Sequence, residues 1–171
     1  YKDAIKANMG LVKEFAKTDK ELAATSLFNV AAIYERARDI PKAIKTYEQV
    51  RKKFPKAKIS PQAQFTIGLI YESQTQFAKA AKAFSKMDIF KEDPQTPDAI
   101  QNAGFIYEAL DKTPSAIKEY QRYIKLFPKR SDIPVVAFRI CVLQQESGGK
   151  KNLNKAKKCY LSFTKKYEES L

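Results

Sequence analysis

The stretch that decides the fold is TPDAIQNAGFIYEALDKTPSAIKEYQRYIKLFP, residues 96–128. It contains two Thr-Pro pairs, and a hydroxyl followed by proline is typical of a helix start because the fixed φ of proline suits the first turn. Between these pairs the apolar residues recur every three or four positions, which predicts two amphipathic helices. Gly104 precedes Tyr107 by three residues, Ala116 follows Tyr107 by nine, and Tyr120 follows Ala116 by four. Antiparallel helices approach closely where side chains are small, so we expect Gly104 to make room for Tyr120.

The same spacing occurs three times along the chain. The tyrosines of the three units, Tyr34, Tyr71 and Tyr107, are 37 and 36 residues apart. The small residue, the alanine and the ring of each unit are Ala31, Ala43 and Tyr47; Gly68, Ala80 and Phe84; and Gly104, Ala116 and Tyr120. Ser60, Thr96 and Thr113, each followed by proline, are expected to cap the helices that they begin. No stretch alternates between apolar and polar residues for long, so we expect an all-α chain.

The two ends of the chain match the pattern only in part. Residues 1–20 correspond to a second helix alone, and the last unit has Cys141 at the position of the glycine. We therefore predict one repeat domain over residues 1–171, with a half repeat at 1–20, repeats at about 22–57, 60–93 and 96–130, and a degenerate repeat at 132–168. The unpaired first helix indicates either that the chain is a piece of a longer protein or that this helix caps the array.

The composition argues against an enzyme. The chain contains no histidine, so Ser-His and Cys-His catalytic pairs and histidine-bound metals are excluded. It also contains neither a GxGxxG nor a GxxxxGK[ST] motif for binding phosphates. We predict no catalytic residue, no metal site and no cofactor. The two cysteines, Cys141 and Cys159, are expected to pack as small hydrophobic side chains. A disulfide across the hairpin is the alternative, which the spacing does not by itself indicate.

These motifs resemble those of the tetratricopeptide repeat family over nearly the whole chain: small-x-x-Tyr, a nine-residue step to alanine, Ala-x3-aromatic and a closing proline. The chain departs from the family in having no tryptophan and in a period longer than the usual length of about 34 residues. The resemblance implies a right-handed superhelix of antiparallel hairpins that acts as a scaffold for protein–protein interaction. The Phe-Pro and Ser/Thr-Pro pairs resemble bacterial cell-envelope members, which implies the periplasm or the outer membrane as the compartment, with the cytoplasm as the alternative.

In this family the first helices line a concave groove, and the resemblance implies which side chains face it. Phenylalanines would anchor a segment of a partner, a row of glutamates along one rim would select a basic or amide-rich ligand, and polar neighbours would hold its backbone. The implied partner-binding residues are the anchors Phe28, Phe65, Phe105 and Phe138, the glutamates Glu35, Glu72 and Glu108, and the polar residues Asn29, Thr66, Gln101, Asn102 and Arg139. The alternative interpretation is that the rings complete the packing between helices.

The chain is strongly basic, with 32 Lys and Arg against 19 Asp and Glu and a formal net charge of +13. Most of the lysines fall on the predicted second helices, where they would coat the convex side. Nucleic acid or another acidic polymer, or an anionic membrane, is therefore an alternative partner, and such binding would weaken with salt. The competing interpretation of the lysines is a solvated face. A third hypothesis for the function is a non-catalytic repeat region within a larger multidomain protein.

Overall fold

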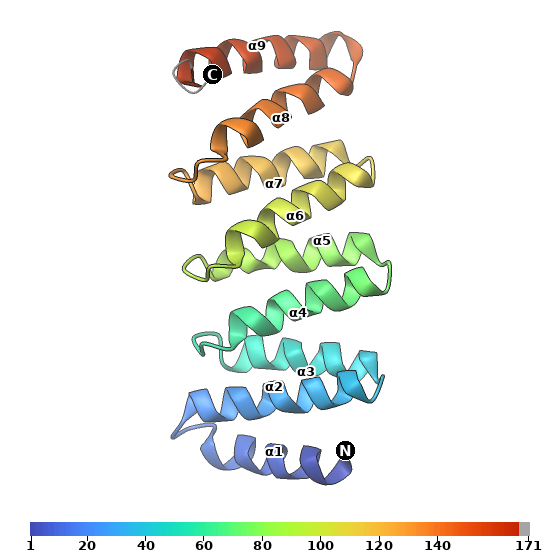
Figure 1. Ribbon diagram of the computed structural model, residues 1–171, viewed down its shortest axis with the longest axis vertical. Coiled ribbons are helices and arrows are strands. Elements are labelled where there is room, and N and C mark those ends of the chain that lie inside the picture. Colours follow the sequence, from blue (N-terminus) through green and yellow to red (C-terminus); the bar gives the residue numbers. More distant parts are fainter. Residues whose placement is uncertain (168–171) are drawn as a thin grey trace. The chain divides into compact units, whose positions relative to one another are not determined.

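The computed structural model describes residues 1–167, and these form α-helices and one short 3-10 helix without a strand (Figure 1). The expected all-α helical-repeat fold is thus confirmed for the described residues. The chain divides into two compact units, residues 1–96 and 97–171. The elements are α1 (Lys2–Phe15), α2 (Lys20–Arg36), α3 (Ile40–Lys53), α4 (Ser60–Ser73), α5 (Phe77–Ser85), η1 (Lys86–Ile89), α6 (Thr96–Ala109), α7 (Thr113–Leu126), α8 (Ile133–Glu146) and α9 (Gly149–Tyr167).

The first unit contains α1 to α5 and η1, and each element packs against the next one along the chain. Leu27 of α2, Tyr47 of α3 and Ile67 of α4 belong to one buried cluster that runs through this unit. Burial of such apolar surface is the main favourable contribution to folding. Because a helix in a repeat array contacts only its neighbours, this stabilisation is local.

The second unit contains the hairpin of α6 and α7 and the hairpin of α8 and α9. Its core gathers Ile100 of α6, Tyr120 and Tyr123 of α7, and Ile140 of α8, all of them buried. α7 packs against α8, and α8 packs against α9. The two tyrosine rings are the largest fully buried side chains of this unit together with Ile100.

The glycines on the first helices make room for rings on the second helices, as the spacing predicts. A Cβ atom added at Gly68 would lie 2.6 Å from Cδ1 of Phe84, and one added at Gly104 would lie 2.7 Å from Cδ1 of Tyr120. Both distances are shorter than real Cβ contacts, so neither position can take a side chain without movement of the ring. The close approach of α4 to α5 and of α6 to α7 therefore depends on these glycines.

The hydroxyls that precede the prolines do not cap their own helices, which corrects the expectation from the sequence. α4 and α6 begin at Ser60 and Thr96 as predicted. The hydroxyl of Ser60 donates to the carbonyl oxygen of Phe54 at 2.5 Å, and that of Thr96 donates to the carbonyl oxygen of Phe90 at 2.6 Å. Both side chains are fully buried. They close the loop between hairpins, because a buried hydroxyl must find a partner and the loop carbonyl is the one within reach. At Thr113, the third such position, α7 begins without a side-chain cap.

The turns of the first three hairpins share one backbone form, and the last turn differs because Gly149, the residue after Gly148, also has a positive φ, of 72°. Arg38, Thr75, Asp111 and Gly148 occupy equivalent positions in the four turns and have φ angles of 61°, 57°, 55° and 62°. This left-handed conformation is the usual way to end a helix and is easiest for glycine. Only the last turn has glycine there, so the first three hairpins adopt the turn at a conformational cost.

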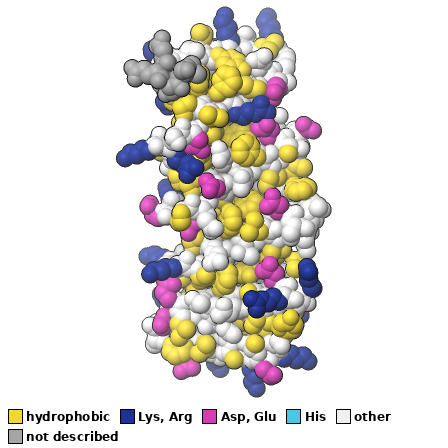
Figure 2. Space-filling view, in the orientation of Figure 1, with side chains coloured by type: hydrophobic (Ala, Val, Ile, Leu, Met, Phe, Trp, Pro, Cys, Tyr) yellow, Lys and Arg dark blue, Asp and Glu magenta, His cyan; other side chains and the backbone are white. Residues whose placement is uncertain are grey.

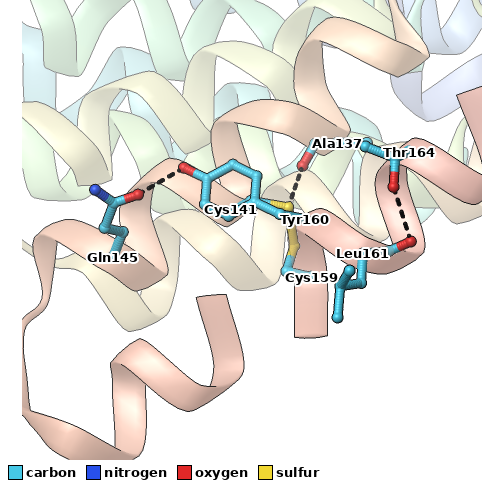
Figure 3. The surroundings of a disulfide bond; sticks show 7 residues. All are labelled: Ala137, Cys141, Gln145, Cys159, Tyr160, Leu161 and Thr164. Atoms are coloured by element: carbon cyan, nitrogen blue, oxygen red, sulfur yellow. Dashed lines mark hydrogen bonds between the residues drawn. A yellow bond between two sulfur atoms is a disulfide. The ribbon is translucent and has the colours of Figure 1, made fainter. Parts of the chain in front are cut away.

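Cys141 and Cys159 form a disulfide, so the expectation that they pack as free hydrophobic side chains is wrong (Figure 3). Their Cα atoms are 5.4 Å apart. Cys141 occupies the α8 position that is glycine in α4 and α6, and Cys159 directly precedes the ring of Tyr160. A covalent bond thus joins the last hairpin at the level where the other hairpins pack a ring against a small residue.

Candidate functional site

The four predicted anchor rings all pack against a second-helix ring of their own hairpin. Their centroids lie 5.0 to 5.7 Å from those rings, in tilted or edge-on geometry. The pairs are Phe28 with Tyr47, Phe65 with Phe84, Phe105 with Tyr120, and Phe138 with Tyr160. Such pairs stabilise a hairpin beyond the area that they bury. One side of each ring therefore takes part in the packing between helices, as the alternative interpretation expected.

The other side of the ring is open in the second unit. Phe105 on α6 remains 50% exposed and Phe138 on α8 remains 46% exposed. Phe28 and Phe65, in the first unit, are less accessible and fall in the intermediate range. Exposed aromatic rings on a firm support are typical of protein-binding surfaces, because little conformational freedom is lost when they are covered.

Two of the three glutamates of the predicted row accept a hydrogen bond from a tyrosine of their own hairpin. The hydroxyl of Tyr47 donates to Glu35, and that of Tyr120 donates to Glu108, both at 2.9 Å. In the second repeat the ring is a phenylalanine without a hydroxyl, and the corresponding Glu72 is exposed. The three glutamates therefore have different environments and do not form a row of equivalent carboxylates.

The last hairpin keeps the same bond with a different acceptor. The hydroxyl of Tyr160 donates to Oε1 of Gln145 at 2.9 Å, and Gln145 follows Cys141 by four residues, as Glu108 follows Gly104 (Figure 3). In each hairpin whose second-helix ring is a tyrosine, its hydroxyl therefore donates to a side-chain oxygen of the first helix. This pairing could have been found in the sequence by comparing the ring position with the residue four places after the small residue.

Arg139 and Glu108 form an ion pair on the candidate surface. Nε of Arg139 donates to Oε1 of Glu108 at 3.0 Å, and Nη2 forms ion pairs with Glu108 and, at 3.5 Å, with Glu146. Partial burial would raise the pKa of Glu108, but the hydrogen bonds from Arg139 and Tyr120 outweigh it and hold the pKa below its usual range. Burial, reinforced by the bond to Glu108, raises the pKa of Tyr120 well above its usual range. Glu108 is therefore charged but already compensated.

An open cleft of about 410 Å³ lies beside this ion pair, within the second unit. Phe105 and Arg139 line it, and so do three carboxylates, Glu108, Asp111 and Glu146. The sequence had not indicated Asp111 or Glu146, because they lie in the hairpin turn and at the end of α8 rather than on the repeated stripe. With three acids against one guanidinium, the cleft has an excess of negative charge.

The remaining polar candidates divide between bonded and open positions. Thr66 donates its hydroxyl to the carbonyl of Gln62 at 2.8 Å. Gln101 donates from Nε2 to Asp132 at 3.4 Å, and this aspartate also accepts the hydroxyl of Tyr123 at 2.6 Å. Asn29 and Asn102 are exposed on α2 and α6. Of the twelve residues implied by the family resemblance, the structure brings Phe105, Glu108 and Arg139 to one cleft.

The fold and the recurring contacts define a helical-repeat protein built from antiparallel hairpins. Residues 25–57 and 98–130 each match the family model described as tetratricopeptide repeat. The chain therefore contains two tetratricopeptide repeats, one in each of these segments. Repeats of this kind generally serve as non-catalytic scaffolds that bind other proteins or peptides.

Solved structures with low sequence identity also resemble the chain. The nearly identical TPR-like repeats of a Podosopora anserina putative kinesin light chain match with 15% identity and a TM-score of 0.47, over 96% of this chain and 87% of that one. BtubC from P. vanneervenii matches with 14% identity and a TM-score of 0.45, over 94% and 74%. MamA 41-end from Desulfovibrio magneticus RS-1 matches with 14% identity and a TM-score of 0.43, over 98% and 97%. The search of curated proteins found no match.

Proposed function

We propose that the chain is a protein-interaction scaffold that holds a segment of a partner on the first-helix face of the second unit. The observation that carries this proposal is the pair of half-exposed rings, Phe105 of α6 and Phe138 of α8, on the two helices that the ion pair of Arg139 and Glu108 joins. Each ring is held from behind by a tyrosine of its own hairpin. A partner would therefore cover apolar surface that is already ordered, which lowers the entropic cost of binding.

The charges of the cleft select the chemistry of the partner. Arg139 is the one cation among the residues that line the cleft and pairs with both Glu108 and Glu146, but Glu146 is 57% exposed and Asp111 is also exposed. These two carboxylates would attract a cation at the side of the cleft. A segment that carries an apolar side chain next to lysine or arginine fits this arrangement. The proposed ligand is thus still basic, but its preference would come from Asp111 in the turn and Glu146 at the end of α8 rather than from the row of glutamates.

The first unit has a candidate contact region of its own. Phe28 and Phe65 are partly buried, and the exposed Asn29 and Glu72 lie on the same first helices. Amide and carboxylate groups of this kind can bond to the backbone of an extended segment. We propose that they form a separate and weaker contact, which lacks a largely exposed anchor ring.

The test uses an array of synthetic peptides that pair an aromatic or aliphatic residue with either basic or acidic neighbours. The protein should retain basic members, and Phe105→Ala with Phe138→Ala should weaken their binding about 30-fold, the usual effect of a central hot spot. Phe77→Ala is the matched control, because Phe77 is 42% exposed on α5 and outside the surface. Helicity is measured for all variants. Retention of acidic peptides, or equal loss with the control, would refute the proposal.

The disulfide supports an assignment of compartment. Disulfides persist in oxidising compartments such as the bacterial periplasm and are rare in the cytosol. The bond between Cys141 and Cys159 therefore favours the cell-envelope location over the cytoplasm. Fractionation of cells that express the full-length protein, with thiol labelling before lysis, tests it. A reduced protein in the cytosolic fraction would contradict it.

A further inference from the structure

Positive charge in this chain is concentrated on the second helix of each hairpin. α4 and α6, which are first helices, carry no lysine or arginine. α9 is the extreme case, because it has seven lysines and neither an arginine nor an acid. They are Lys150, Lys151, Lys155, Lys157, Lys158, Lys165 and Lys166. Dark blue side chains project from the end of the molecule where α9 lies (Figure 2).

Four of these residues form one line on α9, which we call the lysine stripe: Lys151, Lys155, Lys158 and Lys165. Their spacing of four, three and seven residues places them on one face of the helix. All four are exposed. At a rise of about 1.5 Å per residue the stripe is about 20 Å long.

The stripe follows the repeat and is not a random excess of lysine. The residue two places before the second-helix ring is lysine in all four hairpins: Lys45, Lys82, Lys118 and Lys158. The residue five places after the ring is lysine in three of them: Lys52, Lys125 and Lys165. Within the second unit, Lys118 and Lys125 of α7 thus occupy the same register positions as Lys158 and Lys165 of α9.

One residue of the stripe, Lys155, lies beside α7, where it shares a cleft with Gln121. Lys166, which is outside the stripe, shares another cleft with Ile124 of α7. The Glu108 cleft is lined mainly by α6 and α8, with Thr113 at the start of α7, and no residue of α9 lines it. The two surfaces use different residues of the second unit, so a ligand of one need not compete with a ligand of the other.

The stripe lacks internal neutralisation among the residues that the structure describes. The ion pairs of the second unit there involve Arg122, Arg130 and Arg139, and none involves a lysine of α9. Like charges three or four residues apart destabilise a helix. An anionic surface laid against the stripe would relieve this repulsion.

α9 is also held firmly enough to act as a platform. Ala156 and Phe163 are buried against the rest of the hairpin, and the disulfide ties the middle of α9 to α8. Leu161, 62% exposed, borders the stripe on the outer face. The helix thus presents lysines beside an accessible aliphatic side chain.

We propose that the lysine stripe of α9 attaches the protein to the surface of an anionic membrane. Lysine suits this role because it acts as a point charge and does not require a fixed phosphate geometry, for which arginine is preferred. Leu161 would reach the boundary between headgroups and acyl chains, as apolar residues of surface-bound helices do. The stripe has no aromatic residue on which nucleic-acid bases could stack, which disfavours a single-stranded nucleic acid. No described helix is long and apolar enough to cross the membrane itself.

The test is co-sedimentation with vesicles of phosphatidylcholine, with and without phosphatidylserine, over a range of salt concentrations. The protein should bind only the vesicles with phosphatidylserine, and binding should weaken as salt rises. Lys155→Gln, Lys158→Gln and Lys165→Gln together should weaken binding about 100-fold, since each lysine near the surface contributes about fivefold. Circular dichroism checks that this variant remains helical.

The matched control changes Lys2, Lys6 and Lys13 of α1 to glutamine, three exposed lysines with the same loss of charge. This control should keep most of the binding. Equal weakening by both variants would show that only net charge matters and would overturn the proposal. It would also be overturned by absent binding at low salt, or by tighter binding to duplex DNA than to the vesicles at the same salt concentration.

Discussion

Replacing Gly68 by alanine should destabilise the protein, although alanine is the better helix former. The added Cβ would lie 2.6 Å from Cδ1 and 2.8 Å from Cζ of Phe84, whereas ordinary contacts begin at 3.4 Å. The ring must therefore move by roughly 1 Å. It has little room, because Phe84 is only 1% exposed and the ring of Phe65 packs against it at 5.4 Å.

The expected magnitude follows from two opposing contributions. Overpacking a buried site costs about 1–3 kcal/mol, and replacing glycine by alanine within a helix returns about 1 kcal/mol. Gly68→Ala should thus lower the free energy of unfolding by about 1 kcal/mol. Gly10→Ala is the matched control in the same unit, because nothing lies within 4 Å of a Cβ at Gly10. It should raise the free energy of unfolding by about 1 kcal/mol.

Urea unfolding followed by circular dichroism measures both variants. The difference between them, about 2 kcal/mol, is larger than the error of such curves. Adding Phe84→Leu to Gly68→Ala should cost less than Phe84→Leu alone, because the smaller side chain vacates the site. If Gly68→Ala stabilised the protein as much as Gly10→Ala, the close approach of α4 and α5 would not depend on this glycine, and the packing argument would be refuted.

Three further predictions concern the turns, the disulfide and the Glu108 network. Thr75→Gly should raise the free energy of unfolding by about 0.5 kcal/mol, because a β-branched residue at φ 57° is strained; denaturation by urea measures it, and a loss of stability would contradict this. Reduction of the disulfide, which joins cysteines 18 residues apart, should lower the stability of the second unit by about 3 kcal/mol, and hydrogen exchange should rise first in α9; a Cys159→Ser variant that exchanges as slowly as the oxidised protein would exclude it. The pKa of Glu108 lies below its ordinary value of 4.5, so its charged form contributes stability above that pH and the contribution is lost as the pH falls through the lower folded-state pKa. Glu108→Gln should therefore destabilise at neutral pH and cost less in strong acid, as measured by urea unfolding at a series of pH values; a pH-independent cost would count against the network.

The hairpins were predictable from the sequence because their packing depends on the sizes of side chains that are close together along the chain. Gly68 and Phe84, or Gly104 and Tyr120, are 16 residues apart in both cases, and a turn of fixed form brings each pair together. The face that carries the rings was implied by the family resemblance, but their exposure was not: Phe28, Phe65 and Phe138 all lie three positions before the small residue, and only Phe138 is largely exposed. Spacing along a helix is enough to assign a face.

The polar contacts were harder to predict because they depend on which partner comes within reach after folding. Ser60 has the sequence of a helix cap, yet its hydroxyl bonds back to the loop carbonyl of Phe54. Glu108 has the sequence of a free surface acid, yet a tyrosine from α7 and an arginine from α8 reach it. The arginine lies 31 residues away, and no repeat spacing indicates that pair.

The disulfide explains why the last hairpin can depart from the pattern and still hold its second helix. Cysteine at the glycine position leaves no space for a buried ring, and Tyr160 is only partly buried where Tyr47 and Tyr120 are 2% and 1% exposed. The hairpin therefore loses part of the apolar burial that stabilises its neighbours. The covalent bond between Cys141 and Cys159, the residue before Tyr160, compensates for this lost burial. Because the lysine stripe lies on the helix held in this way, the oxidised form is the one in which that surface has a fixed geometry.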